Sequence, residues 1–239
     1  MKAIVFPGQG SQFVGMGYDL YSSFSEAKEV FEEVDDTLEQ NLSKIRFEGP
    51  EETLILTENT QPAIMAVGMA IIKILKRRGF RIESIADILA GHSLGEYTAL
   101  AAAESLSLKD VSLLLKVRGR AMQDAVPNGK GSMAAILGLE NNIVEQVCEE
   151  IDEVVVAANY NCPGQLVISG TYKGIDLACE KLTEAGARRS LKLPVGGAFH
   201  SPLMESAKND LQEAINLSLI HISEPTRRYA ISYAVFCLK

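Results

Sequence analysis

The sequence G-H-S-L-G at residues 91–95 lies between a segment with the composition of a strand and one with the composition of a helix. Residues 84–90 before it are mostly apolar, and residues 96–103 after it are rich in helix-forming alanine. A G-x-S-x-G pattern in this context is typical of a nucleophile elbow, a sharp turn that presents a serine above the edge of a sheet. It predicts that Ser93 is a nucleophile at a helix N-terminus, where backbone N–H groups stabilise negative charge. The alternative is an ordinary glycine-rich turn with a capping serine.

Strand-like and helix-like segments alternate through the first half of the chain, which is typical of an α/β core with a mainly parallel sheet. The expected elements are a buried strand at residues 2–6 and helices at residues 22–40, 63–76 and 108–125. Asn59 or Thr60 is expected to be the N-cap of the second of these helices, because short polar side chains accept hydrogen bonds from the first free N–H groups.

From residue 131 the order becomes strand, helix, strand, strand, helix, strand, which is the order of a ferredoxin-like unit. The expected strands are residues 132–139, 154–158, 165–169 and 187–193, and the expected helices are residues 141–151 and 173–185. We therefore predict a large α/β domain formed by residues 1–127 and 195–216, with a small ferredoxin-like domain inserted at residues 128–194.

The stretch from residue 217 to residue 239 has no amphipathic period and differs from everything before it. It resembles an in-frame translation of a sequencing-library adapter, so we predict a non-native tail and leave it out of the fold. His221 and Cys237 are left out of the candidate site for the same reason. The alternative is a divergent C-terminal strand.

Composition excludes several classes of function. The 239 residues are 47% hydrophobic, which is enough for a sizeable core, and the net charge of −8 gives no reason to expect binding to nucleic acid or to a membrane surface. We find neither a transmembrane-length apolar run nor a signal peptide. The four cysteines lack C-x-x-C spacing, which indicates reduced thiols and a cytoplasmic location. The three histidines lack ligand spacing, so we expect no metal. The glycine-rich turn at residues 8–10 is not a dinucleotide fingerprint, because the G-x-G-x-x-G spacing fails at Phe13, and we expect no cofactor.

A serine hydroxyl is a weak nucleophile until a base takes its proton, and two histidines are candidates for that base. His92 adjoins Ser93 on the turn, so its side chain points elsewhere and a structural role is favoured. His200 lies in a glycine-rich loop at residues 196–202, and loops of this kind commonly present catalytic groups. A solvated loop histidine is an equal alternative for His200.

Acyl transfer through a serine develops negative charge on an oxygen, which needs hydrogen-bond donors. The backbone N–H of Leu94 is one expected donor. The glycine-rich turn around Gln9 could supply a second, although its composition alone favours a plain turn. Arg118 lies on an otherwise apolar helix that presents residues 113–115 to the core, where a guanidinium needs an anionic partner, such as an acyl group with a free carboxylate. The alternative, which holds for most arginines, is a solvated side chain. Arg120 is expected to be solvated.

Four segments together resemble the malonyl-CoA:acyl carrier protein transacylases, a family of acyltransferases. They are residues 6–12, 91–97, 117–119 and 197–201, and residues 159–165 agree with a fifth family segment. The likeness covers residues 1 to about 216. It implies an α/β-hydrolase-like large domain with a parallel sheet and an inserted ferredoxin-like small domain.

The resemblance also implies a reaction in fatty acid biosynthesis. Ser93 would attack the thioester of malonyl-CoA with His200 as general base, and the phosphopantetheine thiol of acyl carrier protein would then take the malonyl group. The backbone N–H groups of Gln9 and Leu94 would form the oxyanion hole. Malonyl-CoA and acyl carrier protein are the implied partners, and we expect a monomer.

Three further residues are implied to contact the substrate. Arg118 would pair with the malonyl carboxylate, which disfavours acyl groups without one because a buried charge would be left unpaired. The bulk of Phe199 would crowd an α-methyl group, as in the malonyl-specific members of related polyketide acyltransferases. Asn161 belongs to the fifth segment and is expected at the substrate.

Two other interpretations remain at this stage. One is a serine thioesterase or esterase that uses water as the acceptor. Arg118 and the Gln9 turn disfavour this interpretation. The other is a non-catalytic domain that binds acyl carrier protein. The family pattern stops after Asn216, where the family continues with a last strand and helices, so we expect the chain as written to fold poorly or to have little activity. The start at Met1, just before the first strand, favours a free-standing protein.

Overall fold

The computed structural model describes residues 1–127 and 129–217, and contacts divide them into two compact units. Within the described residues, unit 1 comprises residues 1–120 and 210–217, and unit 2 comprises residues 121–209. In this described part of the chain, none of the helices has both the length and the apolar character that crossing a membrane requires.

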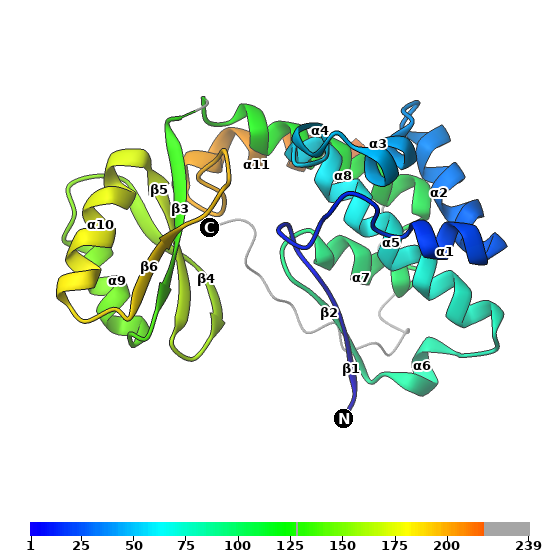
Figure 1. Ribbon diagram of the computed structural model, residues 1–239, viewed down its shortest axis with the longest axis horizontal. Helices are drawn as coiled ribbons and strands as arrows, with labels where there is room; N and C mark the ends of the chain where they lie inside the picture. The colour runs from blue at the N-terminus through cyan, green and yellow to red at the C-terminus, as the bar shows by residue number, and fades with distance from the viewer. Residues whose placement is uncertain (128, 218–239) are drawn as a thin grey trace. The chain divides into compact units, whose positions relative to one another are not determined.

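The sheet of unit 1 is a parallel pair, β1 (Ala3–Phe6) beside β2 (Ile88–Gly91), as Figure 1 shows. β2 is shorter than the predicted strand because α6 (Ile82–Ile85) takes up the beginning of that segment. The prediction that the first strand is buried is wrong. Of its four residues only Phe6 is buried, while Val5 is 66% exposed. The reason is that Phe6 packs with α5 and α7 on one face of the pair, and Val5 alternates to the other face.

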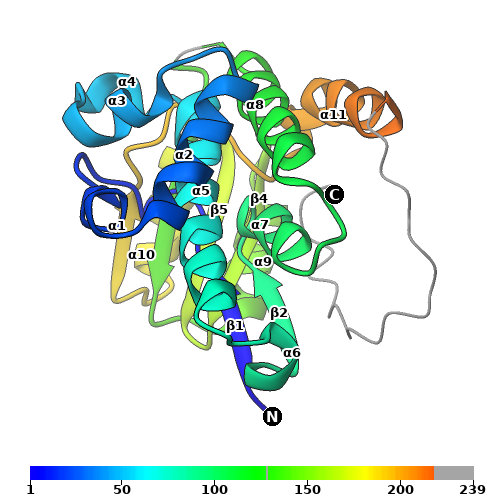
Figure 2. The same cartoon turned by 90° about the vertical axis from the view of Figure 1, so that its right-hand side faces the viewer.

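The other regular elements of unit 1 are helices. They are α1 (Tyr18–Ser23), α2 (Ser25–Thr37), α3 (Leu42–Glu48), α4 (Glu51–Leu54), α5 (Thr57–Arg77), α6, α7 (Gly95–Ala102), most of α8 (Leu108–Asp124) and the second half of α11 (Glu205–Leu217). The helix predicted at residues 22–40 is divided at Phe24, whose backbone is extended. α2 lies along α5, with Phe31 and Val34 buried in the core of the unit (Figure 2).

The start of α5 differs from its prediction. The helix begins at Thr57, so Asn59 and Thr60 lie inside its first turn and do not form the expected N-cap. Their side chains instead donate hydrogen bonds to the carbonyl oxygens of Thr53 (2.9 Å) and Leu54 (2.6 Å). These carbonyls belong to the end of α4, where a helix leaves its acceptors without intrahelical partners. The two side chains therefore join α4 to α5.

Unit 2 contains a four-stranded antiparallel sheet in the strand order β4-β5-β3-β6. Its elements are β3 (Gly131–Leu137), α9 (Asn141–Glu149), β4 (Val155–Cys162), β5 (Gln165–Thr171), α10 (Tyr172–Glu184) and β6 (Arg189–Lys192). The predicted succession of strands and helices is confirmed, with each element's bounds within a few residues. The register places Gly131 opposite Thr171 and Ala134 opposite Lys192.

The two faces of this sheet have different neighbours. α9 and α10 cover one face (Figure 1), where Ala134 and Ile136 of β3 are buried in a common cluster with both helices. The alternate residues Met133 and Ala135 pack on the other face with Phe199, as the two-residue period of a strand requires. A loop, the short 3₁₀ helix η1 (Pro202–Met204) and α11 (Glu205–Leu217) follow β6.

The contact-based boundaries fall at residues 120 and 209, inside α8 and α11, so both helices run from one unit into the other. The division into residues 1–127, 128–194 and 195–216 stays a prediction. The predicted non-native tail, with His221 and Cys237, lies outside the described residues from residue 218 on.

Candidate active site

Ser93 stands on a turn that only glycine neighbours allow. Its φ is 53°, a left-handed value that is uncommon for a residue with a side chain and is often found at functional sites. A Cβ atom on Gly91 would lie 1.9 Å from the carbonyl carbon of Gly95, and one on Gly95 would lie 2.3 Å from the carbonyl oxygen of Phe6. β1, β2 and the start of α7 therefore approach more closely than side chains permit, and the predicted strand–turn–helix geometry is confirmed.

The loop after β1 packs against this turn through His92. A Cβ atom on Gly8 would lie 2.4 Å from Nδ1 of His92, so the imidazole fills the space over Gly8. This contact agrees with a structural role for His92. It also brings the loop that carries Gln9 to the elbow. The side-chain Nε2 of Gln9 donates to Oγ1 of Thr57 at 3.5 Å, and the hydroxyl of Ser11 donates to the carbonyl of Gly8 at 2.9 Å.

Arg118 reaches the hydroxyl of the proposed nucleophile. Its Nη2 donates to Oγ of Ser93 at 3.1 Å, and its Nη1 donates to Oε1 of Gln61 at 2.7 Å. The guanidinium also lies 5.6 Å from the ring centre of Tyr97, within the range of a cation–π contact. Arg118 is only 3% exposed, whereas Arg120 is exposed as expected. A buried cation therefore lies beside Ser93. Two of its hydrogen-bond partners, Ser93 and Gln61, are uncharged side chains.

Gln61 is a site residue that the sequence analysis missed. It lies in the second turn of α5 and is 1% exposed. Its signal in the sequence is weak, since it is a polar residue at the head of an apolar helix and belongs to no motif. A buried amide needs a hydrogen-bond partner, so its position could have suggested a polar contact, but the sequence does not say with which residue.

Gly119 explains how α8 brings Arg118 to Gln61. A Cβ atom on Gly119 would lie 2.5 Å from the carbonyl oxygen of Thr57 and 2.6 Å from the Cα of Glu58. The backbone of α8 therefore lies directly against the first turn of α5. The residue before this glycine, Arg118, thereby comes within hydrogen-bond distance of a side chain one turn further along α5.

Glu96 lies three residues after Ser93 in the sequence and interacts electrostatically with Arg118. Burial raises the pKa of the Glu96 carboxyl above its usual value, and the positive charge of Arg118 counteracts part of that rise. The direction of the shift means that desolvation outweighs the attraction to Arg118. Glu96 is therefore harder to ionise than an exposed glutamate.

Unit 2 carries the other predicted site residues. His200 is half-buried and has a left-handed φ of 59°. The hydroxyl of Ser201 donates to the carbonyl of Ala198 at 2.6 Å and accepts from the backbone N–H of Leu203 at 3.3 Å, so the turn around His200 is closed by local hydrogen bonds. Phe199 is buried in the cluster on the β3 face. Asn161 is exposed near the end of β4, beside the β4–β5 turn.

The predicted residues thus fall into two sets. Unit 1 brings together Ser93, Leu94, Arg118 and the loop of Gln9, and unit 2 holds His200 next to Phe199, with Asn161 on a different element. Within the residues that the structure describes, no group of histidine, cysteine and acidic side chains could hold a metal ion.

Known proteins share this fold and much of this sequence. The family model described as "Acyl transferase domain" matches residues 3–234 of the chain. The chain belongs to the acyl transferase domain family.

Among its relatives is the malonyl CoA-acyl carrier protein transacylase of Bacillus subtilis (strain 168), which is 48% identical over 217 residues, or 90% of this chain and 67% of the relative. The structure is similar to that of the acyl-carrier-protein-S-malonyltransferase from Bartonella henselae, with a TM-score of 0.88 and 49% identity over 91% of this chain and 70% of that one. It is also similar to a malonyl-transacylase solved in complex with its type II PKS acyl-carrier protein, with a TM-score of 0.86 and 39% identity over 90% and 69% of the two chains. The resemblance found in the sequence is confirmed.

Proposed function

We propose that this chain transfers the malonyl group of malonyl-CoA to the phosphopantetheine thiol of acyl carrier protein in fatty acid biosynthesis, through a malonyl ester on Ser93. The observation that carries the proposal is the hydrogen bond from buried Arg118 to the hydroxyl of Ser93. A guanidinium beside an elbow serine suits an acyl group that ends in a carboxylate, because the two can form paired hydrogen bonds. The names of the relatives agree with this chemistry.

In the first half of the reaction Oγ of Ser93 attacks the thioester carbonyl carbon of malonyl-CoA, and His200 takes the hydroxyl proton. The carbonyl oxygen becomes an oxyanion, which accepts hydrogen bonds from the backbone N–H groups of Gln9 and Leu94. When this intermediate collapses, the carbon–sulfur bond breaks. Coenzyme A leaves as a thiol with the proton that His200 held, and the malonyl group remains as an ester on Ser93.

The second half reverses these roles with a new thiol. His200 takes the proton of the phosphopantetheine thiol, whose sulfur attacks the malonyl ester on Ser93. The same N–H groups hold the second oxyanion. Its collapse breaks the bond to Oγ of Ser93, which recovers its proton from His200. The left-handed backbone of His200 and the closed turn around it support a catalytic role for this loop, because backbone strain of this kind persists where function requires it.

Three residues are proposed to select the acyl group. Arg118 binds the malonyl carboxylate, and an acetyl group would leave this buried cation without that partner. Phe199 limits the space beside the α-carbon, and its burial in a packed cluster supports a fixed position for the ring. Asn161 is proposed to contact the substrate on the basis of the family segment to which it belongs.

The two units are proposed to be an α/β-hydrolase-like domain and a ferredoxin-like domain. The parallel pair that leads into the elbow supports the first assignment. The antiparallel order β4-β5-β3-β6, with two helices on one face, supports the second. We also propose that the protein works in the cytoplasm as a monomer. The cysteines of the described residues, Cys148, Cys162 and Cys179, are free, which supports the location only.

A transfer assay with three forms of the chain tests the proposed function. Malonyl-CoA and holo-acyl carrier protein are mixed with the unsubstituted chain, Ser93→Ala and Arg118→Ala. We expect Ser93→Ala to reduce transfer by about 10⁴-fold or more, since covalent catalysis is lost. Arg118→Ala is expected to shift the preference from malonyl-CoA toward acetyl-CoA. Release of malonate at the rate of transfer when acyl carrier protein is left out would instead show a thioesterase.

A further inference from the structure

Gln61 is a buried, neutral contact of the cation at the site. Its Oε1 accepts a hydrogen bond of 2.7 Å from Nη1 of Arg118, while Nη2 of the same guanidinium donates to Oγ of Ser93. Both Gln61 and Arg118 are at most 3% exposed. One end of the guanidinium is thus held by α5 and the other reaches the nucleophile, so the amide of Gln61 sets the direction in which Arg118 points.

The chemistry of the pair fixes which atom of the amide faces Arg118. A guanidinium has five N–H donors and no acceptor, so only the oxygen of the Gln61 amide can bond to it. A glutamate carboxylate has almost the same shape and would make the same contact with a full negative charge. The choice of glutamine at residue 61 therefore supplies orientation without adding an anion to the contact.

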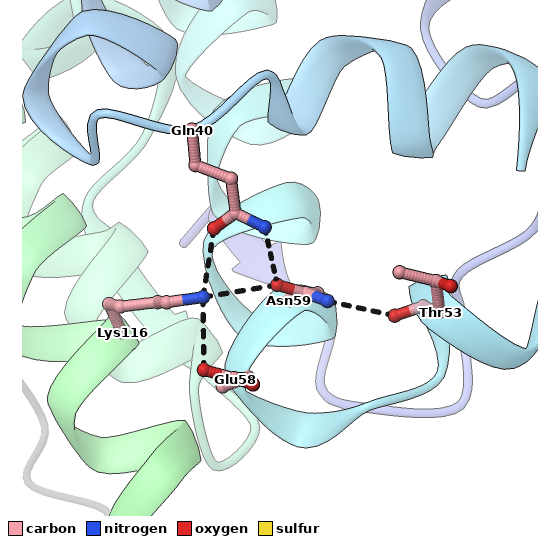
Figure 3. A network of polar contacts seen from close by, with 5 residues as sticks. All are labelled: Gln40, Thr53, Glu58, Asn59 and Lys116. Carbon is pink, nitrogen blue, oxygen red and sulfur yellow. Dashed lines mark hydrogen bonds and ion pairs between the residues drawn. The ribbon is translucent and has the colours of Figure 1, made fainter.

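The backbone that carries this contact is fixed independently of it. Lys116, two residues before Arg118 on α8, donates to Oε1 of Gln40 (2.8 Å) and to Oδ1 of Asn59 (3.1 Å), and it pairs with Glu58 (3.1 Å), as Figure 3 shows. Gly119, about one turn further along α8, lies against Thr57 and Glu58. This second network joins α8 to the first turn of α5, so changes at Gln61 act on the direction and charge at Arg118 more than on the packing of the two helices.

We propose that Gln61 is a specificity-determining residue, whose neutral amide aims the guanidinium of Arg118 toward the acyl group and thereby favours acyl groups that carry a carboxylate. This inference rests on the proposed function. A carboxylate at residue 61 would form a fixed ion pair with Arg118 and would repel a substrate carboxylate at short range in a poorly solvated site. An acetyl group has no charge and would not experience that repulsion.

The test is the variant Gln61→Glu, measured with malonyl-CoA and acetyl-CoA as alternative donors. We expect the malonyl-to-acetyl ratio of kcat/KM to fall by about 100-fold, mostly through loss of malonyl transfer, because a like charge opposes the substrate carboxylate. Acetyl transfer serves as the internal measure of folding and of the reactivity of Ser93. A variant that transfers acetyl groups but keeps the wild-type ratio would overturn the proposal.

Gln40→Glu is the matched control. It makes the same change of charge and shape at another glutamine that accepts a hydrogen bond from a cation on α8, here Lys116. Gln40 also donates to Asn59, which Lys116 continues to contact when that donor is lost. The malonyl-to-acetyl ratio of kcat/KM should remain within about twofold of wild type in Gln40→Glu. The carboxylate introduced at residue 40 would pair with Lys116 and not with Arg118. An equal fall of the ratio in both variants would overturn a specific role for Gln61.

Gln61→Ala keeps the proposal testable if Gln61→Glu does not fold. It removes the acceptor without adding a charge, so we expect the ratio to fall by about tenfold, less than in Gln61→Glu, as orientation is lost. An unchanged ratio in Gln61→Ala would overturn the proposal. Failure of the proposed function is a different result, namely an unsubstituted chain that is folded and forms no malonyl ester on Ser93.

Discussion

The two units hold their proposed catalytic residues by different means. In unit 1 the backbone around Ser93 is confined by glycines, and a Cβ atom at Gly91 or Gly95 would collide with backbone atoms at about 2 Å. In unit 2 the turn of His200 is held by the hydrogen bonds of Ser201 and by burial of Phe199. The backbone approach beside this turn is looser, since a Cβ atom on Gly131 would lie 2.7 Å from the backbone nitrogen of Ala198. Steric confinement allows no alternative geometry, whereas a loop held by a few hydrogen bonds can adjust. The proposed nucleophile, Ser93, is thus fixed by its fold, and the proposed base, His200, lies on the more adaptable turn.

The strongest test of this contrast is to replace a glycine by alanine near Ser93 in unit 1 and near His200 in unit 2. Gly95→Ala puts a Cβ atom 2.3 Å from the carbonyl oxygen of Phe6, so β1 and α7 must separate. We expect a loss of about 4 kcal/mol or more, or no folded unit 1, because strain in a packed core is among the largest single-residue effects. Urea denaturation followed by circular dichroism measures it.

Gly196→Ala, in the loop that leads to His200, is the control. Apart from Gly196 itself and its two chain neighbours, no atom of the described residues lies within 4 Å of the Cβ that it would add, so the expected change is within about 1 kcal/mol. Equal losses of stability for both variants would remove the difference between the units.

His200→Ala addresses the chemical side of the comparison. We expect malonyl transfer to fall by about 1000-fold, since general base catalysis contributes on this scale. The variant keeps the hydrogen bonds that Ser201 makes in the turn, so we expect it to fold. The assay is kcat/KM for transfer to acyl carrier protein. His92→Ala, which loses a packing contact with Gly8, should cost activity much less. A larger loss for His92→Ala than for His200→Ala would reverse the assignment of the base.

Glu96→Gln gives the smallest expected effect and tests the electrostatics of unit 1. Folding raises the pKa of Glu96. At a pH between the unfolded and folded pKa values, the carboxyl is therefore protonated in the native state and ionised in the unfolded state. The stability of wild type relative to Glu96→Gln should therefore be greatest below the unfolded pKa and decrease as the pH rises through the folded one. We expect less than about 1 kcal/mol at neutral pH, given the half-buried carboxylate. A relative stability that rises with pH would contradict the direction of the shift.

Patterns that depend on neighbouring residues were predictable. The elbow at Ser93 follows from glycine spacing between a strand and a helix, and the order of strands and helices in unit 2 follows from local periodicity. Of the residues 113–115 that the apolar face of α8 was expected to bury, Leu114 and Leu115 are buried but Leu113 is 41% exposed. A run of three consecutive residues cannot all lie on one helical face.

Features that depend on contacts between distant segments were not predictable. The start of α5 depends on hydrogen bonds from Asn59 and Thr60 to the end of α4, which no local pattern encodes. Gln61 accepts a hydrogen bond from Arg118, 57 residues away in the sequence, because Gly119 has no side chain and α5 can pack directly against α8. For His200 the composition of the loop left two interpretations equal, and only the family resemblance favoured a catalytic one.

The central claim is that Ser93 carries the malonyl group on its way to acyl carrier protein. Mass spectrometry of the chain after brief incubation with malonyl-CoA measures this directly, with proteolysis to locate the adduct and a second sample to which holo-acyl carrier protein is added. We predict a malonyl adduct on the peptide that contains Ser93, none in Ser93→Ala, and its transfer to the phosphopantetheine thiol when the carrier is present. An adduct on another residue, or one on Ser93 that the carrier does not remove, would contradict the account.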